Sequence, residues 1–247
     1  KAVAAAVEQE GIAFLPAGVY AISRTISLPP GTVLRGESAQ TTTITNHRAQ
    51  SLRPGLATDR PKQSYTPAMV YVPDGRTVVQ DLSLRFMPAA APVMQVGRDM
   101  HWAEDVSLYR VTFEGRQQFG LSPDHEYTAK PVVIYNCRRL RMIRCETLGA
   151  GGVGCARKLE DCQFTENRFI TDRRWRGSAF KFWGAERCIF ENNLMQGDTR
   201  GLVMQTSFGV NYRNFIAGNT VERASLGGNA GETFLFDSRQ LVNAPRR

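Results

Sequence analysis

Few cysteines, no long apolar run and no blocks of like charge are found in this sequence. Five cysteines in 247 residues are too few, and too odd a number, for a framework of disulfides. No Cys-x-x-Cys or Cys/His spacing indicates a zinc site. No apolar stretch is long enough to span a membrane, and no signal peptide is visible at the amino end. The sequence therefore predicts no disulfide scaffold, no structural zinc and no membrane partner.

The charge is unbalanced but not concentrated. The formal net charge is +8, which favours anionic partners, yet the Lys and Arg residues are scattered along the chain. Nucleic-acid binding would call for a basic stripe with interleaved stacking aromatics, and none is visible. We therefore expect an anionic partner other than nucleic acid.

A repeat is the strongest feature that the sequence does contain. Three near-copies of one sequence motif cover residues 162–169, 188–195 and 214–221. Each copy carries an apolar residue followed by an asparagine, and both recur at a step of 26 residues, as in Asn167, Asn193 and Asn219. A fixed period of this size indicates an architecture in which each unit buries its apolar face against its neighbours.

The apolar runs within one repeat have the length and composition of strands rather than helices. It holds three apolar runs of about five residues, rich in aromatic and branched side chains, which is typical of strands. An asparagine at one fixed place indicates a turn, because Asn tolerates the left-handed backbone conformation. Three strands and three turns in about 26 residues predict one coil of a parallel β-helix. Cys162 and Cys188 then stack about 4.8 Å apart as buried thiols.

A family resemblance rests on the amino-terminal part. The run Phe14-Leu15-Pro16-Ala17-Gly18-Val19-Tyr20, followed by the run from Leu28 to Gly36, places strands between Pro-x-Gly turns. It resembles the first coil of the pectate-lyase superfamily of right-handed parallel β-helices, which includes polysaccharide lyases, polygalacturonase-like hydrolases and phage tailspikes. The resemblance implies an all-β, single-stranded, right-handed β-helix and a carbohydrate partner. The Gly-Asp-Gly-x-x-Asp-Asp segment that usually precedes this coil is missing, so we expect a trimmed amino end.

We expect one domain over residues 1–247. Residues 1–10 are Ala-rich and are predicted to end a helix that caps the first coil. Residues 46–67 and 114–130 break the coil pattern and are predicted to be insertions, either functional lids or plain surface loops. Residues 238–247 form a polar, basic tail that cannot close another coil.

Outward positions on the third strand of each coil, and the polar breaks before them, are the places for chemistry. If Phe180 and Phe182 point inward, the two-residue period puts Lys181 and Trp183 outside, together with Tyr135, Val203, Gln205, Leu235 and Asp237. Stacking should align these groups on one long face. The predicted catalytic residues are Lys181, Asp198, Arg200, Glu232 and Asp237.

Substrate contacts are predicted from aromatic and guanidinium groups, which suit sugar rings and acidic substituents. The predicted substrate-binding residues are His125, Tyr135, Arg176, Trp183 and Gln205. Each candidate has a structural alternative: the aromatics can be half-buried rim residues, Asp198 with Arg200 a surface ion pair, and Lys181 a lysine that reaches past the apolar strand to solvent. Glu232 and Asp237 can cap a terminal coil.

Two enzyme mechanisms remain open. In a lyase, a base removes the proton beside a uronic acid carboxylate while a cation neutralises the developing charge, and Lys181, Arg176 or Arg200 can fill these roles. In a hydrolase, two carboxylates flank the glycosidic bond, and Asp198 with Glu232 or Asp237 is the pair. The positive charge favours an acidic polysaccharide and β-elimination.

No cofactor is required by the sequence. Ca²⁺ is left open as one, although the clustered aspartates of the usual pectate-lyase calcium site are absent. The non-enzyme alternative is a carbohydrate-binding or tailspike-like β-helix. A polysaccharide partner implies a secreted, periplasmic or cell-surface protein. The oligomeric state is not indicated.

Overall fold

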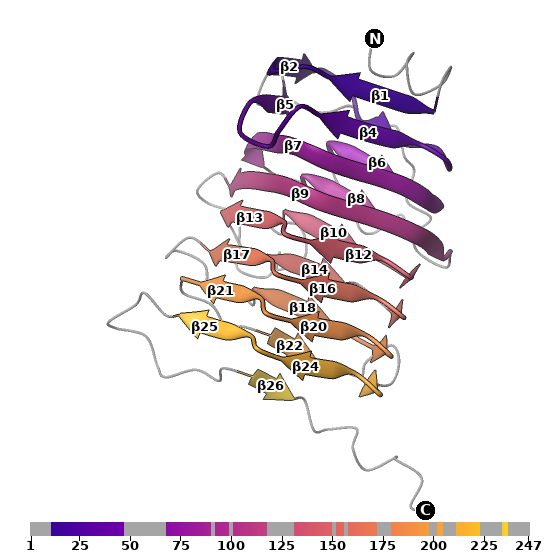
Figure 1. Cartoon of the computed structure of the whole chain (residues 1–247), viewed down its shortest axis with the longest axis vertical. Coiled ribbons are helices and arrows are strands. Elements are labelled where there is room, and N and C mark those ends of the chain that lie inside the picture. Colours follow the sequence, from indigo (N-terminus) through magenta and orange to yellow (C-terminus); the bar gives the residue numbers. More distant parts are fainter. Residues whose placement is uncertain are drawn as a thin grey trace, which may run out of the picture.

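The computed structural model is a stack of β-coils with the amino end at one end of the stack and the carboxyl end at the other (Figure 1). In the described part of the chain, no helix has the length and apolar character needed to cross a membrane. All ladders between named strands are parallel, and the chain forms the predicted right-handed parallel β-helix. The described residues are 11–46, 68–89, 92–98, 101–117, 131–149, 152–155, 158–171, 179–197, 202–204, 211–222 and 234–236.

The first coils differ in length and contain two long strands. β7 and β9 each run for 15 residues, so they pass without a break through places where later coils turn. The strands of this part are β1 (Ile12–Leu15), β2 (Gly18–Ile22), β3 (Ile26–Ser27), β4 (Val33–Gly36), β5 (Thr42–Asn46), β6 (Val70–Val72), β7 (Gly75–Ala89), β8 (Met94–Val96) and β9 (Ala103–Gln117).

From residue 131 onward the coils are regular. Each has the three predicted strands and, in addition, a two-residue strand at one corner. The strands are β10 (Val132–Ile134), β11 (Cys137–Arg138), β12 (Arg141–Ile143), β13 (Glu146–Gly149), β14 (Val153–Cys155), β15 (Leu159–Glu160), β16 (Gln163–Thr165), β17 (Arg168–Thr171), β18 (Phe180–Phe182), β19 (Ala185–Glu186), β20 (Ile189–Glu191), β21 (Leu194–Gln196), β22 (Leu202–Met204), β23 (Asn211–Tyr212), β24 (Phe215–Ala217), β25 (Thr220–Glu222) and β26 (Phe234–Phe236).

Two opposite sides of the solenoid matter for function, the eight-stranded sheet and the row of strands that faces it. The eight-stranded sheet has the order β26-β22-β18-β14-β10-β8-β6-β3. The row β12, β16, β20 and β24, which we call the front row, lies in front of it in Figure 1 and continues β7 and β9. Apolar side chains from both sides meet inside the coil, so a residue directed outward on either side does not belong to the core.

A ladder of phenylalanines joins the front row to the eight-stranded sheet. The rings of Phe164 and Phe190 stack with centroids 5.1 Å apart, one coil after the other. Phe190 also stacks on Phe182, at 4.9 Å, and contacts the edge of Phe180 at 5.3 Å. All four side chains are at most 1% exposed. Offset and edge contacts of this kind add to the burial of large apolar area, which explains why the repeat keeps aromatics at these positions.

The asparagine ladder is confirmed. Asn193 lies between β20 and β21, and its Nδ2 donates to the Oδ1 of Asn219 at 2.9 Å and to the Phe164 carbonyl at 2.9 Å. Its own Oδ1 accepts from the backbone N–H and the Nδ2 of Asn167, at 3.0 and 2.9 Å. Because Asn167 and Asn193 are almost fully buried, their hydrogen bonds satisfy polar groups that would otherwise lack partners at the turn.

The reason given for asparagine at this turn needs correction. The left-handed conformation belongs to the residue before each ladder position, with φ of 56° at Glu166, 53° at Asn192 and 63° at Gly218. The ladder asparagine is needed for its hydrogen bonds instead. Cys145 takes the equivalent place in the preceding coil, where its backbone N–H donates to the Oδ1 of Asn167 at 2.9 Å.

The predicted cysteine stack is confirmed by register. β15 pairs with β19, and β16 with β20, at the step that places Cys162 against Cys188. Both thiols are free and buried. Burial raises the pKa of Cys162, and a hydrogen bond between the two thiols together with burial raises that of Cys188. Both thiols therefore stay protonated and act as small apolar groups.

The predicted insertions begin inside strands. Asn46 ends β5, where it pairs with Ile22. Glu114 to Gln117 continue β9, because Arg85 on β7 lies opposite and its Nε donates to Glu114 Oε2 at 2.7 Å. The sequence shows a loss of alternation there but not this cross-strand ion pair. The predicted cap in residues 1–10 and the tail 238–247 lie outside the described residues.

Candidate functional site

One position on each strand of the eight-stranded sheet forms a continuous row. Pairing of neighbouring strands gives the order Ser27, Tyr71, Gln95, Val133, Gly154, Lys181, Val203 and Leu235. We call this the back row. The predicted common register of Lys181, Val203 and Leu235 is therefore confirmed.

Tyr71 and Lys181 of the back row point away from the core. On β6, Val70 and Val72 belong to the apolar core cluster and Tyr71 between them does not. The same alternation holds on β18, where Phe180 and Phe182 belong to the core on either side of Lys181. Side chains of a strand alternate between its two faces, so the sequence correctly predicts the direction of Lys181.

The predicted solvent exposure of these residues is wrong. Lys181 is only 8% exposed, and Tyr135 and Trp183 are each 9% exposed. Val133 and Tyr71 of the same sheet are 6% and 5% exposed. The outward side of the eight-stranded sheet is therefore enclosed at these five residues, whereas Ser27 of the same row is exposed and Gln95 is partly exposed. Alternation fixes which side of a strand a residue occupies, and it carries no information about what covers that side.

Lys181 and Trp183 form the chemical centre of this enclosed face. The Lys181 Nζ lies 5.7 Å from the centroid of the Trp183 ring, within the range of a cation–π interaction. Charged side chains are seldom buried to this extent unless they are paired. A buried cation next to an indole ring is an arrangement that can hold an anionic group on a flat, apolar-faced ligand.

Tyr71 is a polar member of the back row that the sequence analysis missed. Burial raises its pKa, while the charge of Arg98 lowers it and that of Asp74 raises it. Asp74 follows the carboxyl end of β6 and Arg98 that of β8, and the Arg98 Nη2 lies 3.6 Å from Asp74 Oδ1. The signal was weak because the coils before residue 131 have no constant length, so no step in the sequence aligns Tyr71 with Lys181.

Most predicted site residues lie outside the described part of the chain, so their placement stays a prediction. This holds for the carboxylate pairing and for the arginines offered as base or neutralising groups. The residues concerned are His125, Arg176, Asp198, Arg200, Gln205, Glu232 and Asp237.

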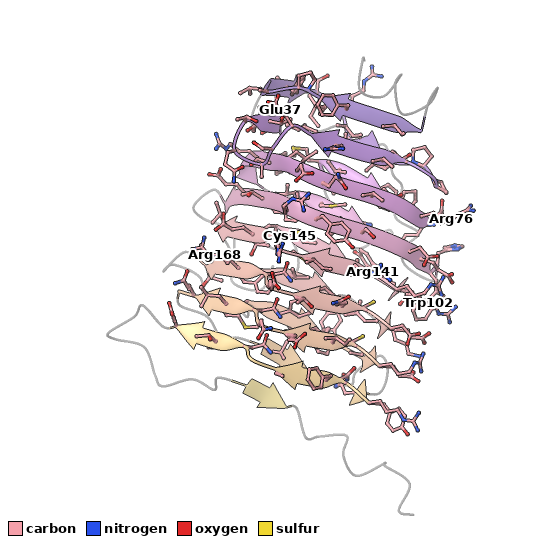
Figure 2. All side chains as sticks on the ribbon, in the orientation of Figure 1. Glu37, Arg76, Trp102, Arg141, Cys145 and Arg168 are labelled. Atoms are coloured by element: carbon pink, nitrogen blue, oxygen red, sulfur yellow. The ribbon has the colours of Figure 1, made fainter. Side chains whose placement is uncertain are left out.

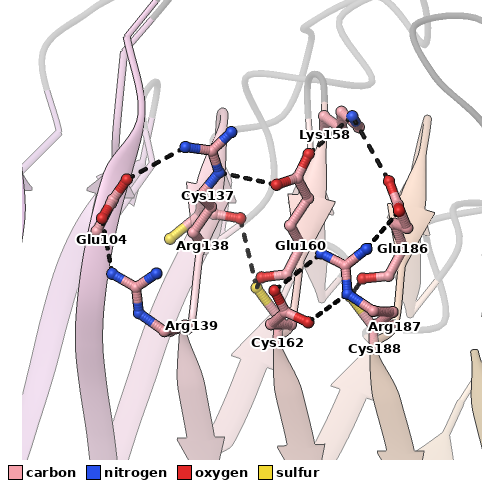
Figure 3. Close-up of polar contacts among 11 residues, drawn as sticks. Glu104, Cys137, Arg138, Arg139, Lys158, Glu160, Cys162, Glu186, Arg187 and Cys188 are labelled. Atoms are coloured by element: carbon pink, nitrogen blue, oxygen red, sulfur yellow. Dashed lines mark hydrogen bonds and ion pairs between the residues drawn. The ribbon is translucent and has the colours of Figure 1, made fainter.

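The densest cluster of charge lies elsewhere, at the corner with the two-residue strands, and Figure 3 shows its contacts. We call it the corner ladder. Each cation contacts two carboxylates, which come from its own coil or from a neighbouring coil. Arg76 and Trp102 lie along this edge in Figure 2. The residues of the corner ladder are Glu104, Asp105, Arg138, Arg139, Lys158, Glu160, Asp161, Glu186 and Arg187.

The charged side chains of the corner ladder are paired with one another. Arg138 Nε donates to Glu160 Oε2 at 2.8 Å, and Lys158 Nζ lies 2.8 Å from Glu160 Oε1. Burial raises the pKa of Glu160, but hydrogen bonds from these two cations outweigh that effect and lower it. The Trp102 ring lies 4.1 Å from the Arg138 guanidinium carbon. Because these charged side chains form ion pairs with one another, we assign the corner to the stability of coil stacking and do not take it as the candidate site.

Among the described residues, no group of three or more His, Cys, Asp or Glu side chains is arranged to hold a metal ion. The back row itself offers an ammonium, a phenol and an amide, from Lys181, Tyr71 and Gln95. Of these, only the amide oxygen is a usual ligand of Ca²⁺, which takes about six to eight oxygen ligands. We therefore derive the chemistry of the site from its side chains.

Comparison of the sequence with known families gives one match over most of the chain. The profile of the family described as "Rhamnogalacturonase A/epimerase, pectate lyase-like" matches residues 1–227. No curated protein sequence matches the chain.

Solved structures with a similar course of the backbone include two pectin methylesterases. The enzyme from Yersinia enterocolitica is 13% identical, with a TM-score of 0.48, over 95% of this chain and 92% of that chain. The enzyme from carrot is 13% identical, with a TM-score of 0.37, over 91% and 78%. A surface adhesin of Streptococcus pneumoniae is 10% identical, with a TM-score of 0.31, over 94% and 91%.

Proposed function

The chain belongs to the rhamnogalacturonase A/epimerase, pectate lyase-like family, and from this premise we propose that it cleaves an acidic, uronic-acid-containing polysaccharide of the pectin type by β-elimination. The observation that carries the proposal is the enclosed cation of the eight-stranded sheet. Lys181 is 8% exposed, points away from the core and lies over Trp183.

The ammonium group of Lys181 is suited to stabilise the substrate carboxylate, on which negative charge accumulates during the reaction. In β-elimination the proton on the carbon beside the carboxylate is removed, and its electron pair forms a carbon–carbon double bond. The glycosidic bond on the next carbon breaks, and its electrons leave on the oxygen, which takes up a proton. Negative charge builds on the carboxylate as the first proton leaves. An ammonium already held in a water-poor place stabilises that charge without reorganisation.

The remaining roles follow from the sequence-based candidates. We assign the indole of Trp183 and the ring of Tyr135 to stacking on sugar faces, because both rings lie on the same side of the sheet as Lys181. Arg176 and Arg200 are our candidates for the base. A polymer substrate of this kind is met outside the cell, so we propose a secreted or cell-surface protein.

The test is a screen of acidic and neutral polysaccharides with two readouts, the ultraviolet absorbance of the new double bond and the number of reducing ends. We expect both to rise with an acidic polymer and neither to rise with a neutral one. Reducing ends without new absorbance would replace the lyase by a hydrolase, whose candidates are Asp198, Glu232 and Asp237. Binding without either signal would indicate a carbohydrate-binding β-helix.

A further inference from the structure

Among the described positions of the back row, Gly154 is the one that carries no side chain. It lies on β14, where Val153 before it belongs to the apolar core cluster, so strand alternation directs position 154 away from the core. Val133 precedes it in the row and Lys181 follows it. Between these two side chains, the row presents only backbone.

The backbone conformation does not explain this glycine. Gly154 pairs with both neighbouring strands in the regular parallel register, which residues with side chains also adopt. Gly152 on the same coil has a different reason, because a Cβ there would lie 1.7 Å from the Ala179 carbonyl oxygen. A glycine inside a strand weakens the strand, and it often marks a place where another backbone or a ligand approaches closely. At Gly154 such a group can approach from the enclosed outward face.

The flanks of Gly154 suit a sugar ring that carries a carboxylate. Val133 is 6% exposed and Lys181 is 8% exposed, so position 154 lies between an apolar side chain and a buried ammonium group. Neighbouring strands are about 4.8 Å apart, a spacing comparable to the width of one pyranose ring. A ring over Gly154 can therefore pack on the β14 backbone and direct its carboxylate to Lys181, where the charges attract and hydrogen-bond.

We infer that Gly154 is a specificity-determining residue, because its missing side chain lets one uronate ring approach β14 closely enough for the carboxylate to reach Lys181. The inference rests on the proposed function for the identity of the sugar. It adds which coil carries the acidic ring that Lys181 recognises. It also adds that the size of the residue at position 154 limits what binds there.

The test fills the position in two steps, with Gly154→Ala and Gly154→Val. Valine suits a strand, and replacing a glycine by a residue that adopts the same conformation stabilises the folded protein. We expect melting temperatures equal to or above that of wild type. With the acidic oligosaccharide that the protein cleaves, kcat/KM should fall in Gly154→Ala and fall further in Gly154→Val, by roughly 5- to 150-fold, as overpacking of a fitted site predicts.

The matched control is Ser107→Val, which adds the same kind of bulk on the other side of the solenoid. Ser107 is a partly buried, outward-directed residue of β9, between Val78 and Arg141 on the front row, and we expect unchanged kcat/KM. Full activity in Gly154→Val would overturn the inference. A clear fall of the melting temperature in Gly154→Ala, or failure of Gly154→Val to fold, would also overturn it, because position 154 would then pack against the protein itself.

Binding separates this inference from the proposed function. If no acidic polysaccharide is cleaved, the proposed β-elimination fails, and calorimetric titration with trigalacturonate still decides the role of Gly154. Weaker binding by Gly154→Val than by wild type and Ser107→Val supports the inference. Equal affinity, or no binding by the wild type, contradicts it. Cleavage that Gly154→Val leaves intact would contradict the inference and leave the proposed function standing.

Discussion

Two outward-facing rows run along the solenoid, and they differ in how far solvent reaches them. On the front row, Arg141 is exposed, and Ile189 and Phe215 are 37% and 55% exposed. On the back row, Tyr71 and Lys181 are at most 8% exposed. Strand alternation is the same on both sides. The two rows therefore differ in burial. Exposed residues of the front row only cover the core, whereas the buried residues of the back row can bind a charged ligand with little water around it.

The largest expected effect comes from the packing that joins the two sides. Phe190→Ala removes a ring that is 1% exposed and stacked between Phe164 and Phe182. We expect the free energy of unfolding to fall by about 3–5 kcal/mol. Phe215→Ala, on the front row, should cost less than about 0.5 kcal/mol. Urea denaturation of both variants measures the difference, and equal losses would mean that the two positions do not differ in burial.

The next effect concerns the turn that holds the front row to the following strand. Asn193→Ala leaves the backbone N–H of Asn167 and the carbonyl of Phe164 without their present partners. We expect a loss of about 1–3 kcal/mol, the cost of unsatisfied buried polar groups. Gln163→Ala, also on the regular coils but only partly buried, serves as the control. A loss no larger than that of the control would show that the ladder does not stabilise the turn.

A smaller effect is expected from the corner ladder, and it depends on pH. The pKa of Asp161 is lowered, chiefly by a hydrogen bond from Arg187, and that of Asp105 is lowered, chiefly by one from Arg139. Carboxyls with a depressed folded pKa stabilise the protein above their unfolded pKa of about 4. This contribution is lost as the pH falls through the folded values. The free energy of unfolding should therefore decrease below about pH 4.

Glu160→Gln tests that dependence, because Glu160 accepts from both Arg138 and Lys158. We expect a loss below about 1 kcal/mol at neutral pH and a shallower fall of stability in acid. Glu191→Gln is the control, since Glu191 makes no ion pair in the described ranges. Denaturation curves at several acidic pH values measure how the free energy of unfolding falls with pH. If the fall in Glu160→Gln is as steep as in the wild type, the corner ladder is not the source of the acid sensitivity.

The smallest effect is expected at a core hydroxyl. Thr147 is fully buried in β13, and its Oγ1 has no hydrogen-bond partner. Thr147→Val keeps the shape and should stabilise by about 0.5 kcal/mol. Thr42→Val should instead destabilise, because Thr42 Oγ1 accepts from the backbone N–H of Glu37 at 3.0 Å. Thermal melts with opposite shifts would support this, and a clear loss in Thr147→Val would contradict it.

The periodic part of the sequence predicted the periodic part of the fold. A constant step placed Asn167, Asn193 and Asn219 on one ladder, because a solenoid turns equal sequence spacing into vertical stacking. Lys181, Val203 and Leu235 do not follow this step, and they were aligned through alternation within their strands instead. The left-handed residues before the ladder were missed because Glu166, Asn192 and Gly218 share no residue type that the repeat could reveal, and Glu166 is of a type that carries no turn signal.

For the candidate site, the sequence predicted on which side of the strand Lys181 lies but not how deeply it is buried. Lys181 was placed on the correct side from its neighbours in β18, but its burial depends on what packs over the sheet, which a two-residue period does not encode. Tyr71 was missed because coils of unequal length separate it from the regular repeat. Long-range register in that part is set by cross-strand pairing, and a single sequence shows such pairing only where spacing is constant.

The most direct measurement applies one chemical change to both outward rows. Lys181→Met and Arg141→Met each replace a cation by an unbranched apolar side chain, one on the enclosed side and one on the exposed side. With an acidic polysaccharide as substrate, we predict that Lys181→Met lowers kcat by about 100-fold or more, with a melting temperature near that of wild type. Arg141→Met should keep activity within about twofold. Full activity in Lys181→Met, or an equal loss in both variants, would contradict the assignment of chemistry to the enclosed side.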